Sequence, residues 1–77
     1  MRTYQLENKE IDKHFLAGES IQCPAVVPIT DLPGPGERLV VLLSNGKKYM
    51  GEIQEFDHTV SGDHAQGQLR IVRYVKK

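Results

Sequence analysis

Apolar and polar residues alternate over residues 20–30, which is the pattern of a half-buried β-strand. The odd-numbered positions carry the apolar face: Ile21, Cys23, Ala25, Val27 and Ile29. Pro24 and Pro28 share the opposite parity, so their two missing N–H groups face the same side of the strand. We predict an edge strand whose open side is blocked by proline.

Five consecutive apolar residues within residues 38–44 predict a strand that is covered on both faces, and we expect it at the centre of the sheet. Asn45-Gly46 follows at once. This pair predicts a tight hairpin with a type I′ turn, because that turn needs positive φ at both central positions. The chain is therefore expected to return through residues 47–57.

The return strand changes phase along its length. Tyr49, Gly51 and Ile53 share one parity, whereas Phe56 lies on the other. This shift predicts a bulge or sharp coil between Ile53 and Phe56. Gly51 has no side chain, so we expect it to bend the strand across a small barrel.

The N-terminal region predicts a short strand over residues 2–6 and then a helix of about two turns. Asn8 suits the N-cap, and Gly18 suits the position just after the helix. Ile11 and Phe15 lie four residues apart and therefore on one helical face.

Three further segments complete the chain. Residues 31–37, "DLPGPGE", interrupt regular structure, and residues 58–67, "HTVSGDHAQG", predict a loop or a weak short strand followed by a loop. Residues 68–75 carry apolar side chains on both parities. That pattern suits a final strand that crosses a barrel or joins a second subunit.

Together these elements predict an all-β fold at the margin of α+β: a compact SH3-like barrel of about five strands with one short N-terminal helix. The 77 residues make a single domain, 1–77. A chain of this size buries only about 60% of its extended surface on folding. Because 39% of its residues are hydrophobic, the small core favours stabilisation by a partner chain, and we expect a homo-oligomer.

Charge excludes a strong global attraction to nucleic acid or membrane, because ten basic residues balance ten acidic ones. Binding to either must come from a local patch. One set of basic residues has two interpretations, the second of at least equal weight. The residues contact phosphates, or they are solvated charges at a turn and a chain end. This set is Lys47, Lys48, Arg70, Arg73, Lys76 and Lys77.

Cys23 is the single cysteine, which excludes an internal disulfide. It lies on the apolar parity of its strand, so we expect a buried, inert thiol. No segment approaches the ~20 apolar residues of a membrane span or the layout of a signal peptide. A reducing, cytoplasmic setting is the expectation.

One stretch resembles the first motif of the Sm-like (Sm/Hfq) family over residues 38–57. The family combines an alternating apolar strand, an Asn-Gly or Asp-Gly turn, a glycine, an aliphatic residue and Phe-Asp. The matching positions are Val41, Leu43, Asn45, Gly46, Tyr49, Gly51, Ile53, Phe56 and Asp57.

The resemblance implies a strongly bent five-stranded barrel, rings joined through strand edges, and binding of single-stranded RNA near the pore. Family members contact RNA through the loop after Phe-Asp and an Arg-Gly step in a second motif. Asp57 matches, Thr59 stands at the stacking position with His58 one place earlier, and Ser61 replaces an asparagine. Arg70 is the counterpart of the arginine, followed by Ile71 in place of glycine.

The same stretch is similar to Tudor-type barrels, in which a Gly-Lys-x-Tyr-x-Gly-x-Ile hairpin is common. Their aromatic cage for methylated side chains needs several aromatic residues. This chain supplies only five and no tryptophan, so RNA binding ranks above methyl recognition.

The remaining chemistry favours a non-catalytic protein. Asp57-His58 and Asp63-His64 lack the ligand spacing of a structural metal site, so we expect no metal and no cofactor. No nucleophile-elbow pattern surrounds a serine, and a domain of this size has little room for a substrate pocket. We therefore expect no enzyme activity and no small-molecule substrate.

The leading hypothesis is an oligomeric Sm-like module that binds single-stranded RNA. Its lysines and arginines contact the backbone, and His58 or Tyr74 is available for base stacking. The candidate site residues are Lys47, Lys48, Asp57, His58, Thr59, Ser61, Arg70, Arg73 and Tyr74. The alternatives are a protein–protein adaptor that docks a peptide along a strand edge, and a structural subunit of a larger assembly.

Overall fold

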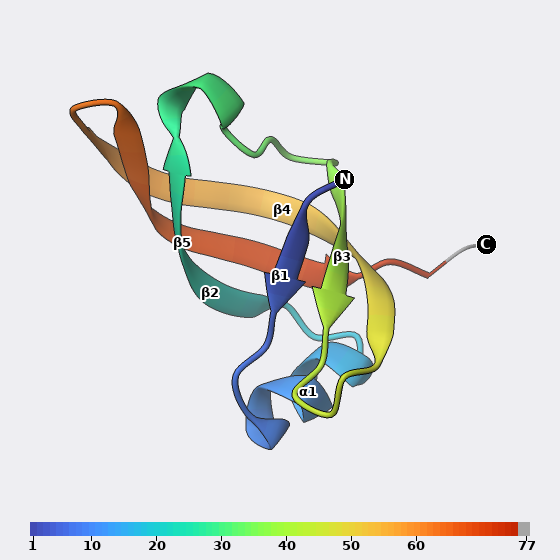
Figure 1. The fold of residues 1–77 in the computed structure, drawn as a ribbon. Coiled ribbons are helices and arrows are strands. Elements are labelled where there is room, and N and C mark those ends of the chain that lie inside the picture. Colours follow the sequence, from blue (N-terminus) through green and yellow to red (C-terminus); the bar gives the residue numbers. More distant parts are fainter. Residues whose placement is uncertain (76–77) are drawn as a thin grey trace.

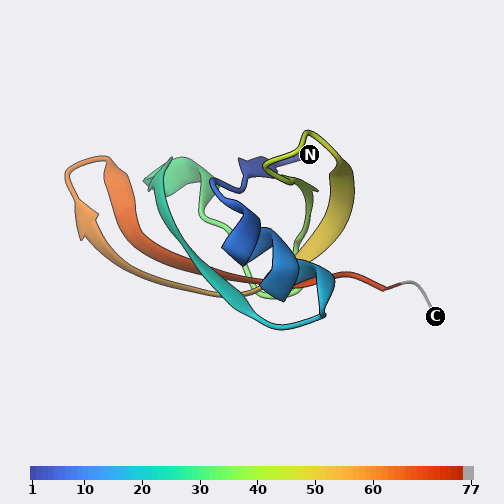
Figure 2. The same cartoon turned by 90° about the horizontal axis from the view of Figure 1, so that it is seen from below.

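The computed structural model describes residues 1–75 and shows one curled sheet with a short helix across one end (Figures 1 and 2). Over this range the fold is small, all-β and barrel-like, as the sequence predicts. The elements in chain order are β1 Thr3–Gln5, α1 Lys9–Leu16, β2 Ile21–Pro28, the 3-10 helix η1 Ile29–Asp31, β3 Arg38–Leu42, β4 Lys48–Ser61 and β5 His64–Arg73.

The strands form a single mixed sheet in the order β1-β3-β4-β5-β2. β3, β4 and β5 make an antiparallel meander, and β2 pairs antiparallel with β5. β1 joins the other edge, parallel to β3. The sheet curls, so the edge strands β1 and β2 approach each other without pairing, which leaves an open seam in the barrel (Figure 1).

One apolar cluster fills the curl, and it confirms the predicted inward face of β4 and that of β2 at Ile21 and Cys23, whereas Ile29 lies outside β2 and is exposed. Leu39, Val41 and Ile53 have no exposed surface, and Phe15 closes the end of the cluster from α1. Burying side chains of this kind stabilises the fold by about 1.5–3 kcal/mol each. The buried members of the cluster are Leu6, Phe15, Ile21, Cys23, Leu39, Val41, Leu43, Ile53, Phe56, Ala65, Leu69 and Ile71.

Helix α1 has the predicted caps and is tied to the β3–β4 hairpin. The Asn8 side chain accepts a hydrogen bond from the Ile11 N–H at 2.9 Å, and Gly18 adopts a φ of +84° just after the helix. Asp12, a buried carboxylate, accepts hydrogen bonds from the N–H and the hydroxyl of Ser44. These hydrogen bonds compensate for the burial of the Asp12 carboxylate.

The β3–β4 turn differs from the predicted type I′ form. No described residue other than glycine has positive φ, so Asn45 cannot occupy that turn's first central position. Instead, the Leu43 N–H donates to Lys47 and the Leu43 carbonyl accepts from Gly46. This is a three-residue loop in which Gly46, at a φ of +88°, supplies the left-handed residue.

β4, rather than the apolar run of β3, occupies the centre of the sheet. β3 is an interior strand with β1 on one side and β4 on the other. Its second face is only half-buried at Val40 and Leu42. The prediction of a strand covered on both faces is therefore wrong, because no layer packs on the outer face of the sheet there.

The predicted phase shift in β4 is confirmed as a register shift between Ile53 and Glu55. Gly51, five residues after the turn glycine, is buried in the inward face. A Cβ there would lie 2.8 Å from Val41 Cγ2 and 3.0 Å from Ile71 Cγ2. Gly51 thus makes room for neighbouring side chains, beyond any effect on strand curvature.

Residues 58–67 form a hairpin rather than the predicted loop. β4 continues to Ser61, turns at Gly62 with a φ of +63°, and returns as β5 from His64. Most side chains of this extension are polar, with Val60 and Ala65 as exceptions, so its sequence lacks the apolar alternation by which strands are recognised. Backbone pairing to β5 and β2 holds it.

The prolines of β2 face the open seam, as predicted. The Pro24 carbonyl accepts a hydrogen bond from the Tyr4 hydroxyl of β1 at 2.7 Å, so this residue's backbone groups point away from β5. Pro28 has the same parity. Two of the four outward positions of this edge therefore lack a donor.

Candidate nucleic-acid interface

The structure gathers four of the nine candidate residues at the end of the sheet where β4 begins and β5 ends. Lys47 and Lys48 lead into β4, and Arg73 and Tyr74 leave β5 beside them, because the Tyr74 N–H donates to Met50 in β4 at 2.9 Å. Two further residues join them. We call this set the basic end: Arg38, Lys47, Lys48, Tyr49, Arg73 and Tyr74.

Arg38 and Tyr74 form one Arg–Tyr stack of the basic end. The Arg38 guanidinium carbon lies 4.2 Å from the centre of the Tyr74 ring. Arg38 opens β3 and is exposed, while Tyr74 is half-buried on the outer parity of β5. The stack therefore presents a flat cationic surface to solvent.

Arg73 and Tyr49 form the second stack, on the side of the sheet nearest α1. The guanidinium lies 5.0 Å from the Tyr49 ring centre, and its Nη1 donates to the Leu16 carbonyl at the end of the helix at 3.1 Å. Tyr49 in turn meets Phe15 edge to face at 6.4 Å. These contacts fix the position of Arg73 and neutralise part of the negative end of the helix dipole.

The cations of the basic end have no carboxylate partner within the described residues. The ion pairs found there involve Arg2, His14 and His64 instead. Glu52 is the register partner of Arg38, but the two do not form an ion pair. These cations are therefore not tied up in ion pairs with described residues and are available to an anionic ligand.

Four other candidate residues lie on the far part of β4, away from the basic end. Asp57, Thr59 and Ser61 are exposed, and His58 is half-buried. His58 stacks on Phe56 at 4.5 Å, and its Nδ1 donates to the Phe56 carbonyl at 2.8 Å. Asp57 lies nine positions after Lys48 in β4, which is about 30 Å along the strand. The structure does not bring these two groups together.

Arg70, the ninth candidate, belongs to neither group. It is half-buried in β5, with Glu55 of β4 and Gln22 of β2 as its register partners. The Arg70 position therefore lies between the basic end and the far part of β4.

Arg38 and Tyr49 were missed as site residues by the sequence patterns. The patterns place Tyr49 on a strand face and in the Sm-like motif, and Arg38 at the start of a strand, without indicating that either binds a ligand. Their roles depend on the chain continuing past Arg73 alongside β4, which places Tyr74 beside Arg38. No local spacing in the sequence encodes that pairing.

Cys23 and Tyr4 are the titratable groups near the seam with shifted pKa values. Cys23 is a free, buried cysteine, as predicted, and burial raises the pKa of its thiol. Burial, and then the neighbouring Cys23, raise the pKa of Tyr4 to about 12. Both groups are therefore neutral at physiological pH, which argues against a reactive thiolate at this position.

Residues 1–75 contain neither a candidate metal site nor a candidate membrane-spanning helix. The described histidines, cysteines and carboxylates form no cluster of three or more that could hold a metal ion. No helix in this part of the chain has the length and apolar character needed to cross a membrane.

Comparison with known proteins identifies no family for the chain. No family model, no curated protein and no solved structure matches it.

Proposed function

We propose that this protein is a non-catalytic module that binds single-stranded RNA through the basic end. The observation that carries the proposal is the pair of Arg–Tyr stacks flanked by Lys47 and Lys48, with no carboxylate partner for these cations among the described residues. The Sm-like motif over residues 38–57 supports the same class of ligand. A reducing, cytoplasmic setting forms part of the proposal.

Each part of the basic end has a distinct role in this proposal. Lys47 and Lys48 are exposed and contact phosphates as flexible point charges. The Arg38–Tyr74 stack offers a guanidinium plane and an aromatic face to an unpaired base. Arg73 is held by Leu16 and Tyr49, so it contributes a fixed positive charge.

Oligomerisation would increase the affinity for RNA by placing several copies of the basic end on one assembly. One basic end of six residues binds only a few nucleotides, and several copies joined through strand edges would engage one strand together. A homo-oligomer is therefore part of the proposed function, and light scattering on the purified chain tests it separately from binding.

The binding test uses fluorescein-labelled uridine and adenosine octamers with fluorescence anisotropy at low and moderate salt. We expect Lys48→Gln to reduce both affinity and salt dependence, because one phosphate contact is lost. Tyr74→Ala should weaken binding by roughly tenfold or more, since loss of one base stack costs about 1–3 kcal/mol. Lys9→Gln, on the first turn of α1, is the matched control and should bind as the wild type does.

Two results would contradict the proposal. One is no retention of either octamer at low salt. The other is an equal loss of affinity for Lys48→Gln and Lys9→Gln, which would indicate a diffuse charge effect. If His58→Ala weakens binding while Tyr74→Ala does not, the RNA contact belongs to the far part of β4.

A further inference from the structure

The two edge strands face each other across a seam and do not pair with each other. The Tyr4 hydroxyl of β1 reaches across it to the Pro24 carbonyl of β2 at 2.7 Å. An extended tyrosine side chain with a hydrogen bond at its tip spans roughly two strand spacings of about 4.8 Å each. The edges are therefore too far apart to pair with each other, and an added strand would take the place of the Tyr4–Pro24 contact between them.

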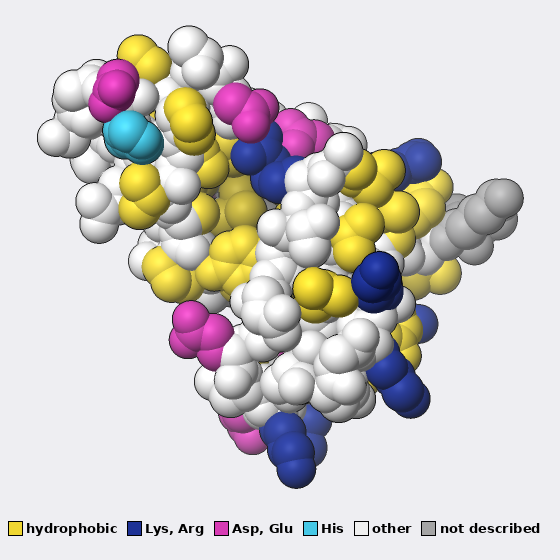
Figure 3. All heavy atoms as spheres, viewed as in Figure 1, with side chains coloured by type: hydrophobic (Ala, Val, Ile, Leu, Met, Phe, Trp, Pro, Cys, Tyr) yellow, Lys and Arg dark blue, Asp and Glu magenta, His cyan; other side chains and the backbone are white. Residues whose placement is uncertain are grey.

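The seam forms a groove of about 350 Å³ with an apolar lining. Hydrophobic side chains are visible in the hollow between β2 and the paired strands β1 and β3 (Figure 3). Val26 lies on its rim and is 61% exposed. The apolar lining consists of Tyr4, Pro24, Ala25, Val26, Val27, Pro33 and Leu69.

Backbone groups on β1 face this groove without a partner in the sheet. The Arg2 carbonyl and the Leu6 N–H bond to β3, so the alternate residues Thr3 and Gln5 direct their backbone groups away from β3. Because β1 is an edge strand, no other strand pairs with them. They form the ladder that an added strand requires.

The opposite edge, β2, offers fewer backbone donors to an added strand than β1 does. Val26 presents both a donor and an acceptor from β2, whereas Pro24 and Pro28 have no N–H and the Pro24 carbonyl already accepts from the Tyr4 hydroxyl. An added strand therefore pairs more completely with β1 than with β2.

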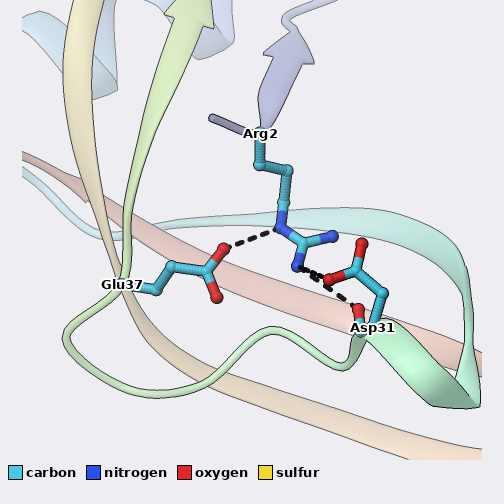
Figure 4. A network of polar contacts seen from close by, with 3 residues as sticks. All are labelled: Arg2, Asp31 and Glu37. Carbon is cyan, nitrogen blue, oxygen red and sulfur yellow. Dashed lines mark hydrogen bonds and ion pairs between the residues drawn. The ribbon is translucent and has the colours of Figure 1, made fainter.

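The charged side chains at the end of the groove indicate which ligand side chain would complement them. Arg2, which also lines the groove, contacts Glu37 at 2.9 Å and Asp31 at 3.3 Å, so two carboxylates share one cation (Figure 4). The Asp31 side chain remains 71% exposed. A ligand cation beside Asp31 would balance the second carboxylate.

We propose that this groove binds an extended peptide segment of a partner protein as an added strand between β1 and β2. The segment pairs with Thr3 and Gln5, directs alternate apolar side chains into the groove and places a lysine or arginine beside Asp31. This function uses a surface that is separate from the basic end.

The test uses the full chain, labelled with ¹⁵N, and a seven-residue peptide of alternating valine and threonine with lysine at both ends. We expect the amide signals of Thr3, Gln5 and Val26 to shift on titration and the binding to persist at high salt, because backbone pairing and apolar contacts carry it. The same peptide with alternate backbone nitrogens methylated should bind at least tenfold more weakly.

Val26→Asp and Val60→Asp are matched variants, since these valines are 61% and 60% exposed and only Val26 lines the groove. We expect at least a tenfold loss of peptide affinity for Val26→Asp and none for Val60→Asp. Asp31→Asn should lower affinity severalfold for the lysine-ended peptide and leave an uncharged version unchanged.

Three outcomes would overturn the proposal. The first is no shift at the three amides at millimolar peptide, and the second is equal affinity of the methylated and unmethylated peptides. The third is a shift of the same amides with protein concentration alone, which would assign the groove to a second copy of this chain. The first two outcomes are independent of RNA binding, whereas the third would be a strand-edge oligomer of the kind that the proposed function includes, so the two functions can still fail separately.

Discussion

The two halves of β4 have the same backbone conformation but different surroundings. Residues 48–52 pair with β3, residues 51–53 pair with β5, and Ile53 is completely buried. Residues 55–61 pair with β5 on one side, and Val60 is 60% exposed. The register shift between Ile53 and Glu55 separates the two halves.

This difference shows that neighbours, rather than strand sequence alone, determine what a strand contributes. The first half has a partner on each side and a core beneath it, so it can hold the basic end in place. The second half depends on backbone pairing and on local contacts such as the His58–Phe56 stack. We therefore expect substitutions in the two halves to have different costs.

The largest expected effect comes from truncating the buried half. Ile53→Ala should lower the free energy of unfolding by about 2–5 kcal/mol, because it removes buried methyl groups and leaves a cavity. Val60→Ala, in the exposed half, should change it by less than about 0.5 kcal/mol. Urea unfolding followed by circular dichroism measures both, and similar losses would mean that the exposed half is also packed in solution.

Gly67 tests how closely the exposed half is held against β5. A Cβ at this position would overlap the Asp57 carbonyl oxygen and lie 2.6 Å from the His58 Cα. Gly67→Ala should therefore force the two strands apart and cost about 1–3 kcal/mol, within the range for overpacking a well-filled site.

Hydrogen exchange locates the effect of that substitution. We expect faster exchange over residues 57–67 and little change over residues 48–53. Gly34→Ala is the control, because no atom lies within 4 Å of the Cβ it would add. Unchanged exchange in Gly67→Ala would show that β4 and β5 are further apart here than the structure places them.

The smallest expected effect is the difference in the free energy of unfolding between substitutions at two arginines of β5. Arg73→Gln loses the stack on Tyr49 and the hydrogen bond to Leu16, and we expect a cost of about 1 kcal/mol. Arg70→Gln should cost less than about 0.5 kcal/mol, since no hydrogen bond or ion pair of the Arg70 side chain is found among the described residues. Thermal unfolding resolves the difference, and an equal cost would remove the structural role of the Arg73 contacts.

The sequence predicts the elements whose residues carry their own signal. Pro24 and Pro28 mark an edge, Asn8 and Gly18 cap a helix, and the change of parity before Phe56 marks a bulge. These features depend on near neighbours along the chain.

Features that depend on tertiary pairing could not be predicted in the same way. The polar hairpin beyond Asp57 has no apolar alternation, so its pairing appears only in three dimensions. Likewise, Arg38 and Tyr74 are brought together by the register of β3, β4 and the end of β5. The basic end is therefore a product of the fold and has no contiguous motif.

The order of strands in the sheet also constrains how the chain assembles. β3, β4 and β5 pair with their neighbours in sequence, whereas Thr3 pairs with Val40 and Ile21 with Ile71. Closing such long loops costs entropy before any contact repays it. β1 can therefore pair only after β3 is present, and β2 only after β5 is present, so we expect the β3–β5 meander to be the template on which β1 and β2 assemble.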